Sequence, residues 1–220
     1  MLYQDLKTIS YADAWQYQHR LFDESIENKS KDLAVVNTLL FCEHPHTITI
    51  GKNGKDSNLL FNERYLSERG VELFHIDRGG DITYHGPGQL VGYPIFDLES
   101  YGIGIRQYIY NLEEIIIRLL ASYGIQSERF QGAAGVWIDT DQPARTRKIC
   151  AIGVRCSRFV TMHGFALNVN TDLSYFSLIN PCGFVDKGVT SMSKELGFEI
   201  DMDDVKDRAE KIFREIFQEI

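Results

Sequence analysis

Extended segments dominate this sequence, and they do not alternate regularly with helices. Thr47 to Ile50 alternates before Gly51, and the apolar run from Leu33 to Phe41 is typical of a buried strand. Further strands are predicted at 71–76, 90–96, 135–138, 148–154 and 159–168. Because a fully parallel sheet needs regular strand–helix alternation, this order instead predicts an α+β fold, a mixed β-sheet with packed helices.

Helices are predicted at three places beside this sheet. One begins near Tyr11, because Ser10 and Asp13 resemble a capping box. A second runs from about 104 to 123, where apolar residues recur at helical spacing and Gly124 fits a C-cap. A third begins near Asp203 and carries one apolar face. Without repeats or an obvious linker, residues 1–220 are predicted to form a single domain.

Composition places the chain among soluble globular proteins. Of 220 residues, 44% are hydrophobic and 25% charged, and the net charge of −8 argues against a general nucleic-acid binder. The N-terminus lacks the regions of a signal peptide, and no stretch approaches the roughly 20 apolar residues that span a bilayer. The four cysteines include no CxxC pair, so we expect free thiols in a reducing cytoplasm.

A glycine-rich segment, RGGDITYHGPGQ, occupies residues 78–89. Four glycines and a proline in twelve residues indicate tight turns and a backbone that a ligand can approach closely. Glycines alone are more typical of an ordinary hairpin loop. The interleaved Arg78, Tyr84, His85 and Gln89 favour a binding loop, which could offer N–H groups to a carbonyl oxygen.

Lys148 begins the segment KICAIG, which is predicted to be a strand. Most lysines are solvated surface charges. This one enters an apolar run, so its stem should be at least partly buried. A partly buried ammonium needs an anionic partner or loses its proton.

Cys182 lies between Pro181 and Gly183, after an apolar segment, and this context predicts a sharp turn. Such a turn exposes a thiol, whereas Cys42 and Cys150 are expected to be small buried hydrophobes. Cys156, close to basic residues but without a turn, is a weaker nucleophile candidate. Roughly 3% of a thiol with an ordinary pKa is thiolate at pH 7, so a neighbouring ammonium can raise the thiolate fraction by less than about thirtyfold. Most of the acceleration must therefore come from positioning and from hydrogen-bond donors to the oxyanion.

Three segments together resemble the lipoyl(octanoyl) transferase family. The family pattern runs RGGxxTYHGPGQ, then GVW followed by KIxxIG, then HGxALNVxxDLxxFxxIxPCG. It is matched at residues 78–89, 135–137, 148–153 and 163–183, and Glu43-His44-Pro45 fits as well. The resemblance extends from about residue 43 to 191 and implies the fold of biotin and lipoate protein ligases.

The resemblance also implies roles for single residues. Cys182 would carry the acyl thioester, and Lys148 would be its partner and lower the thiol pKa. The acyl substrate would lie against three segments: Arg78, Gly79, Gly80, Asp81, Ile82, Thr83, Tyr84 and His85; Ala151, Ile152 and Gly153; and Gly164, Phe165 and Ala166. His44 and His163 fall on family histidine positions, and their individual roles stay open.

The implied activity is a two-step acyl transfer. Octanoyl-acyl carrier protein would acylate Cys182, and a lysine of a lipoyl domain or of glycine-cleavage H protein would then take the octanoyl group. Exchange of one thioester for another is nearly balanced in energy, so neither ATP nor a cofactor is expected. The acyl donor arrives on the phosphopantetheine of the carrier. The oligomeric state is taken by default as a monomer.

A basic stretch of the sequence is a candidate docking surface for these acidic partners. No acidic residue lies between Asp141 and Asp172, while basic residues recur at Arg145, Arg147, Lys148, Arg155 and Arg158. In a chain of net charge −8 this stretch predicts a docking surface for acidic carrier and lipoyl domains. A scatter of solvated charges explains it equally well.

Two other functions stay open from the sequence. The first is an ATP-dependent lipoate or biotin protein ligase on the same fold, which would need no nucleophilic cysteine. The second is a non-catalytic acyl-binding or metal-binding protein, since Cys42, His44 and His46 would share one face of an extended segment. Pro45 interrupts that segment and no recognised metal spacing supports it, so no metal is predicted.

Overall fold

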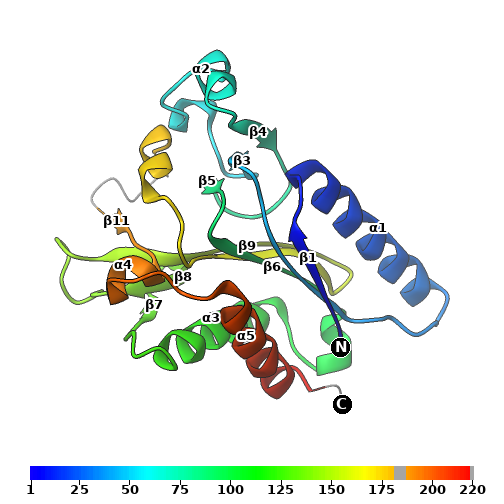
Figure 1. Ribbon diagram of the computed structural model, residues 1–220. Helices are drawn as coiled ribbons and strands as arrows, with labels where there is room; N and C mark the ends of the chain where they lie inside the picture. The colour runs from blue at the N-terminus through cyan, green and yellow to red at the C-terminus, as the bar shows by residue number, and fades with distance from the viewer. Residues whose placement is uncertain (181–186, 219–220) are drawn as a thin grey trace.

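Residues 1–180 and 187–218, described by a computed structural model of the chain, form a large β-sheet with a smaller sheet above it (Figure 1). In the described residues the large sheet has eight strands, in the order β1-β2-β6-β10-β9-β8-β7, with β11 paired to β9. These strands are β1 (Leu2–Thr8), β2 (Thr38–Glu43), β6 (Gln89–Ile95), β7 (Glu128–Phe130), β8 (Ala133–Ile138), β9 (Arg147–Ser157), β10 (Val160–Asn168) and β11 (Gly188–Val189).

The smaller sheet has the order β4-β3-β5, formed by β3 (Thr47–Ile50), β4 (Glu72–His75) and β5 (Ile82–His85). Both sheets are mixed. β1 pairs with β2 in parallel, whereas β2, β6, β10, β9 and β8 pair antiparallel in turn. In the smaller sheet, β3 is parallel to β4 and antiparallel to β5. The predicted α+β fold with a mixed sheet is confirmed.

Helices cover both faces of the large sheet. On the lower face in Figure 1, α3 (Ile105–Ala121) and α5 (Met202–Ile216) pack their apolar stripes onto the strands, with Leu112, Ile116 and Phe213 fully buried. On the upper face, α1 (Tyr11–Ser30) lies beside the smaller sheet. Short helices complete the description: α2 (Glu63–Glu68), α4 (Met192–Leu196), and the 3₁₀ helices η1 (Asp56–Asn58), η2 (Leu98–Tyr101) and η3 (Leu173–Leu178).

The predicted helix starts are confirmed at α1. The Ser10 hydroxyl accepts a hydrogen bond from the Asp13 backbone N–H at 3.1 Å, which satisfies one of the unpaired donors of the first turn. Ala14 and Phe22 are buried on the helix face that packs against the sheet. Gly124, the predicted C-cap, adopts a φ of +79° just after α3, a conformation that favours glycine.

The predicted strand from Leu33 to Phe41 is wrong in its first half. Leu33 is 57% and Val36 63% exposed, and the strand begins only at Thr38. Thr38 is the first residue that has strand partners on both sides, Leu2 of β1 and Ile95 of β6. The start of the strand is therefore set by the available pairing partners and not by apolar composition. The edge strand β1 had no sequence signal, since it is polar and only partly buried.

The chain crosses between the two sheets twice, and the second crossing lies in the glycine-rich segment. Residues 82–85, expected to be part of a loop, form β5 of the smaller sheet, and Gln89 begins β6 of the large sheet. The turn between them requires Gly88, whose φ is +77°. A Cβ there would also lie 2.7 Å from the Asn170 carbonyl. This tight turn opens a space between the sheets. No helix in the described residues is long and apolar enough to cross a membrane.

Candidate active site

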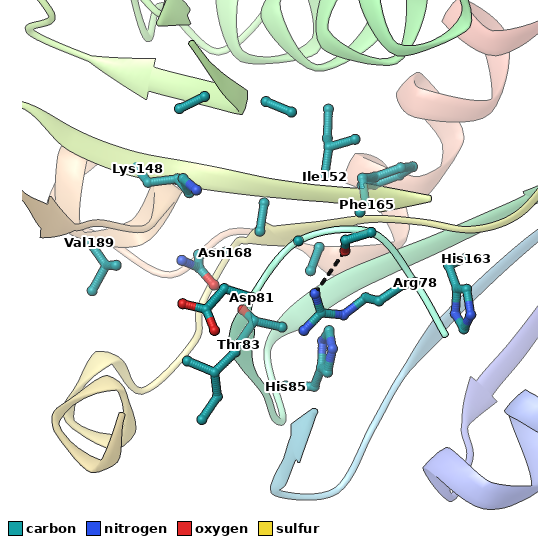
Figure 2. Close-up of a pocket in the computed structure, with 18 of the residues that line it drawn as sticks. Arg78, Asp81, Thr83, His85, Lys148, Ile152, His163, Phe165, Asn168 and Val189 are labelled. Carbon is teal, nitrogen blue, oxygen red and sulfur yellow. Dashed lines mark hydrogen bonds between the residues drawn. The ribbon is translucent and has the colours of Figure 1, made fainter. Parts of the chain in front are cut away.

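A cavity of about 920 Å³ is lined by residues of both sheets and also by Ile105 and Ile109 of α3, from the other face of the large sheet. It is lined by β5, β6, β9, β10, the loop before β5 and the residues on both sides of 181–186. Arg78, Thr83 and His85 approach it from one side, opposite Ile152 and Phe165 of the large sheet (Figure 2). Predicted site residues in the lining are Arg78, Gly79, Gly80, Asp81, Ile82, Thr83, His85, Lys148, Ala151, Ile152, Gly153, His163, Gly164, Phe165 and Ala166.

The glycine-rich loop lies directly on β9. The Gly79 N–H donates to the Val154 carbonyl at 2.9 Å. A Cβ at Gly153 would come within 2.7 Å of the Gly79 carbonyl oxygen, so only glycine fits beneath the loop. Two glycines from segments that are distant in sequence are thus explained by one backbone contact, which forms a wall of the cavity.

Arg78 is a buried cation at the cavity wall. Its guanidinium donates to the Thr49 carbonyl at 2.8 Å, to the Thr49 hydroxyl at 2.9 Å and to the Gly79 carbonyl at 3.1 Å. Within the described residues it forms no ion pair with a carboxylate, and burial lowers its pKa. A guanidinium without a directly paired carboxylate makes this wall favourable for a carbonyl oxygen or an anion.

A hydrogen-bonded chain of side chains crosses the cavity floor. His85 Nδ1 lies 2.8 Å from Gln89 Oε1, and Gln89 Nε2 donates to Asn168 Oδ1 at 2.9 Å. Asn168 Nδ2 in turn donates to the Thr190 carbonyl at 3.0 Å. Burial lowers the pKa of His85 to about 3, so this ring is neutral. The chain connects the smaller sheet to the segment that follows residue 186.

Lys148 projects into the cavity from β9. Its ammonium lies 4.5 Å from the centre of the Trp137 ring, its neighbour on β8. Desolvation by burial lowers its pKa, with a smaller contribution from Arg78 in the same direction. The prediction that this lysine is partly buried is confirmed. An amine with a lowered pKa in a cavity is suited to accept and donate a proton.

Two predicted site residues, His44 and Tyr84, do not line the cavity. The Tyr84 hydroxyl is 2.7 Å from His46 Nδ1, and its ring stacks on Tyr175 on the far side of the smaller sheet. Successive residues of a strand face opposite ways, so Tyr84 faces away because Thr83 and His85 face inward. His44 is fully buried behind the lining, and its Nε2 is 2.7 Å from the hydroxyl of Tyr93, which does line the cavity.

His163 lies at the cavity wall in a charged environment. Its Nε2 is 2.8 Å from Asp77 Oδ1, and Arg155 pairs with the other oxygen of that carboxylate. These interactions hold the Asp77 pKa well below its usual range, the His163 bond being the larger cause. Burial lowers the His163 pKa although Asp77 opposes it. His163 Nδ1 has no hydrogen-bond partner among the described residues.

Cys182 lies outside the described residues, so its predicted placement in a turn is untested. The described residues closest to it in sequence, Asn180 and Lys187, both line the cavity. The Asn180 N–H donates to the Asn58 carbonyl at 2.7 Å, and Val189 pairs with Lys148. Cys42 and Cys150 are buried, as predicted, and burial raises the pKa of both thiols. Cys156 is exposed.

The basic stretch does not form one surface patch. Arg145 and Arg158 lie beyond opposite ends of β9, an eleven-residue strand about 33 Å long. Arg147 pairs with Asp139 and Glu195, and Arg155 pairs with Asp77. Proximity in sequence fails to create a patch here because an extended strand separates its ends. No group of three or more potential metal ligands was found in residues 1–180 and 187–218.

Several cavity residues carried no distinct sequence signal. Tyr11 comes from the start of α1 and Tyr93 from β6, and neither belongs to a family-like segment. Asn168 lies within the family-like segment 163–183, which could have drawn attention to it. The α1 contribution could not have been found, because a long-range contact places Tyr11 there.

Comparison with known proteins gives a consistent result. Residues 10–214 match the family described as the lipoyl protein ligase A/B catalytic domain. The octanoyltransferase of Parabacteroides distasonis is 60% identical over 215 residues, which cover 98% of this chain and 97% of that protein. The octanoyltransferase of Bacteroides fragilis is 55% identical over 204 residues, which cover 93% and 92%.

Solved structures show the same fold at low sequence identity. A bipartite lipoate protein ligase from Thermoplasma acidophilum, described with its E2 lipoyl domain, has a TM-score of 0.72 and 18% identity. The match covers 100% of this chain and 87% of that one. A biotin protein ligase from Aquifex aeolicus has a TM-score of 0.53 and 13% identity, covering 98% and 68%. The predicted biotin and lipoate protein ligase fold is confirmed.

Proposed function

The chain belongs to the lipoyl protein ligase A/B catalytic domain family, and on this premise we propose that it transfers an octanoyl group from acyl carrier protein to a lysine of a lipoyl domain. The close relatives are octanoyltransferases over nearly their full length. The protein is accordingly an acyltransferase that acts in protein lipoylation.

One observation carries this proposal. The family-like segments 78–85, 148–153 and 163–166 are far apart in sequence, yet residues of all three line a single cavity. That cavity combines apolar side chains, such as Val91, Ile152 and Phe165, with the amine of Lys148. The apolar side chains suit an octanoyl chain, and the amine suits proton transfer at its carbonyl end.

In the first step we assign the nucleophile to Cys182. The chain enters and leaves the segment of this residue at Asn180 and Lys187, both in the cavity lining, and this supports the assignment. The thiol gives its proton to the Lys148 amine, and the thiolate attacks the thioester carbonyl of the donor. A new C–S bond forms, the C–S bond to the carrier breaks, and the departing phosphopantetheine sulfur takes the proton from Lys148.

In the second step an acceptor lysine attacks octanoyl-Cys182. A C–N bond forms, the C–S bond breaks, and the surplus proton of the amine passes to Lys148. The lowered pKa of Lys148 supports this role, because a base must be neutral when it accepts the proton. Amide formation from a thioester is favourable, so the proposal needs no ATP and no cofactor. The acceptors are lipoyl domains and the glycine-cleavage H protein.

The test is the intact mass of the protein after incubation with octanoyl-acyl carrier protein in the absence of ATP. The wild type should gain one octanoyl group that hydroxylamine removes, and Cys182→Ser should gain none. Cys156→Ser is the matched control, because that thiol is exposed but far from Lys148 on β9, and it should be acylated like the wild type. Transfer that proceeds without the adduct, or only with free octanoate and ATP, would favour the ligase function instead.

A further inference from the structure

Thr190 is a fully buried junction beside Lys148 that the proposed reaction does not use. Its N–H donates to the carbonyl of Lys148 at 2.9 Å. Its carbonyl accepts from Asn168 Nδ2 at 3.0 Å, and its hydroxyl donates to Glu195 Oε1 at 2.5 Å. One residue therefore connects β9, β10 and α4.

Glu195 and Arg147 extend this junction. The Glu195 carboxylate receives two hydrogen bonds from the Arg147 guanidinium, at 2.7 and 2.6 Å, in a bidentate arrangement. Arg147 also pairs with Asp139. The Arg147 and Glu195 side chains are 21% and 18% exposed, which makes this pair better shielded than the helix-surface pairs of the protein. Arg147 directly precedes Lys148, so the pair holds the strand at that point.

The backbone pairing at this point is short. β11 has only two residues and lies off the main order of the sheet, against β9. So short a pairing is weak by itself. The side-chain bonds of Thr190 and Glu195 add to the backbone hydrogen bonds of Gly188 and Thr190 in keeping this segment against β9 at Lys148. Since Val189 is the direct neighbour of Lys148 across the strands, a shift of the segment would uncover the lysine.

We propose that Thr190 and Glu195, with Arg147, are positioning residues that fix the Lys148 side chain in the cavity. The importance of this position for catalysis rests on the proposed function, whereas the positioning itself can be measured without any turnover. The proposal predicts that removal of the Thr190 hydroxyl changes the environment of Lys148 specifically, beyond a general loss of stability.

The experiment compares Thr190→Val with Thr161→Val. Thr161 is also fully buried in the large sheet, and its hydroxyl bonds to the Pro94 carbonyl at 2.9 Å. It pairs with Cys156 near the opposite end of β9 from Lys148. Both variants thus lose a hydroxyl group from a fully buried threonine. Lys148 is probed in the full-length protein with acetic anhydride at a series of pH values, and labelling is read by peptide mass spectrometry.

In Thr190→Val, labelling of Lys148 should increase, because solvent then reaches the amine. The pH midpoint of labelling should also rise, because burial and Arg78 hold the pKa of the wild-type amine down, whereas Cys150 raises it. Thr161→Val should label like the wild type, and Thr190→Ser should restore the wild-type midpoint. Octanoyl transfer by Thr190→Val should fall about tenfold in kcat, without a change in KM for the donor.

Equal labelling midpoints in Thr190→Val and Thr161→Val would overturn the proposal. A failure of the proposed function is distinguishable from this result. In that case the wild type would transfer no octanoyl group at all, while the labelling contrast between the two threonine variants would still decide whether Thr190 positions Lys148.

Discussion

The two faces of the large sheet are built from different side chains. On the face covered by α3 and α5, buried residues such as Leu112, Ile116, Val205 and Phe213 are almost all apolar. On the face toward the smaller sheet, the buried residues include several polar or charged side chains: Arg78, His85, Gln89, His163 and Asn168. The first face stabilises the fold by removing apolar surface from water. On the second face, burial of polar and charged groups costs part of that stabilisation.

The difference separates stability from chemistry within one sheet. Buried polar groups are tolerated where hydrogen bonds satisfy them, as in the chain from His85 to Thr190. Burying them costs free energy that an apolar side chain of similar size would not cost. Their concentration around one cavity therefore indicates selection for chemistry there. Substitutions on the two faces should consequently have opposite profiles, with losses of activity on one and losses of stability on the other.

The largest effect is expected from Lys148→Met on the cavity face. Methionine preserves much of the side-chain length and the contact with Trp137 but removes the amine. We expect kcat for octanoyl transfer to fall by about 10²-fold or more, the usual contribution of a general acid–base group. The melting temperature should not fall, because a partly desolvated ammonium is lost. Retained transfer, or a drop in melting temperature like that of a core variant, would contradict the separation of the two faces.

Leu112→Ala on α3 should give the opposite profile. Leu112 is fully buried in the core beneath α3, so its truncation leaves a cavity. The free energy of unfolding should decrease by about 2–5 kcal/mol. At a temperature where the variant is folded, kcat should match the wild type. Chemical denaturation measures the stability, and Arg106→Ala, an exposed position on the same helix, is the control that should change neither quantity.

The same contrast explains what the sequence could and could not predict. Apolar periodicity located α3 and α5, and the alternating strand β3, because their burial is a local pattern. The family-like motifs located most of the cavity lining. β1 and the start of β2 were not predictable, because pairing with a distant strand defines both. Tyr84 and Tyr93 show the same limit at the site, since only the two-sheet arrangement decides which tyrosine faces the cavity.

A smaller effect is expected from the buried histidine of the cavity floor. The pKa of His85 is about 3 in the folded protein and near 6.5 when unfolded, so the unfolded state binds the extra proton. This stability is fully present above pH 6.5 and is lost as the pH falls toward 3. Between pH 7 and pH 5 the loss attributable to His85 should be about 2 kcal/mol.

His85→Gln should flatten this acid dependence of the unfolding free energy, measured by urea denaturation at several pH values. His75→Gln is the control, because His75 is an exposed residue of β4. An unchanged pH slope in His85→Gln would mean that the pKa of His85 is the same in the folded and unfolded states. The ring would then not be desolvated, and the contrast between the two faces would be weaker than we infer.

The smallest effect concerns the exposed charges at the two ends of β9. Arg145 lies at the Lys148 end and forms an ion pair with Asp139 at 3.4 Å, whereas Arg158 lies in the turn at the far end. If an acidic donor or acceptor domain docks at the cavity mouth, Arg145→Glu should lower kcat/KM about threefold at low salt and lose this effect at high salt, because exposed charges are screened. Arg158→Glu should have no effect. Equal losses in both variants would mean that partners sense the net charge of the whole protein, and a docking surface at one end of the sheet would have to be abandoned.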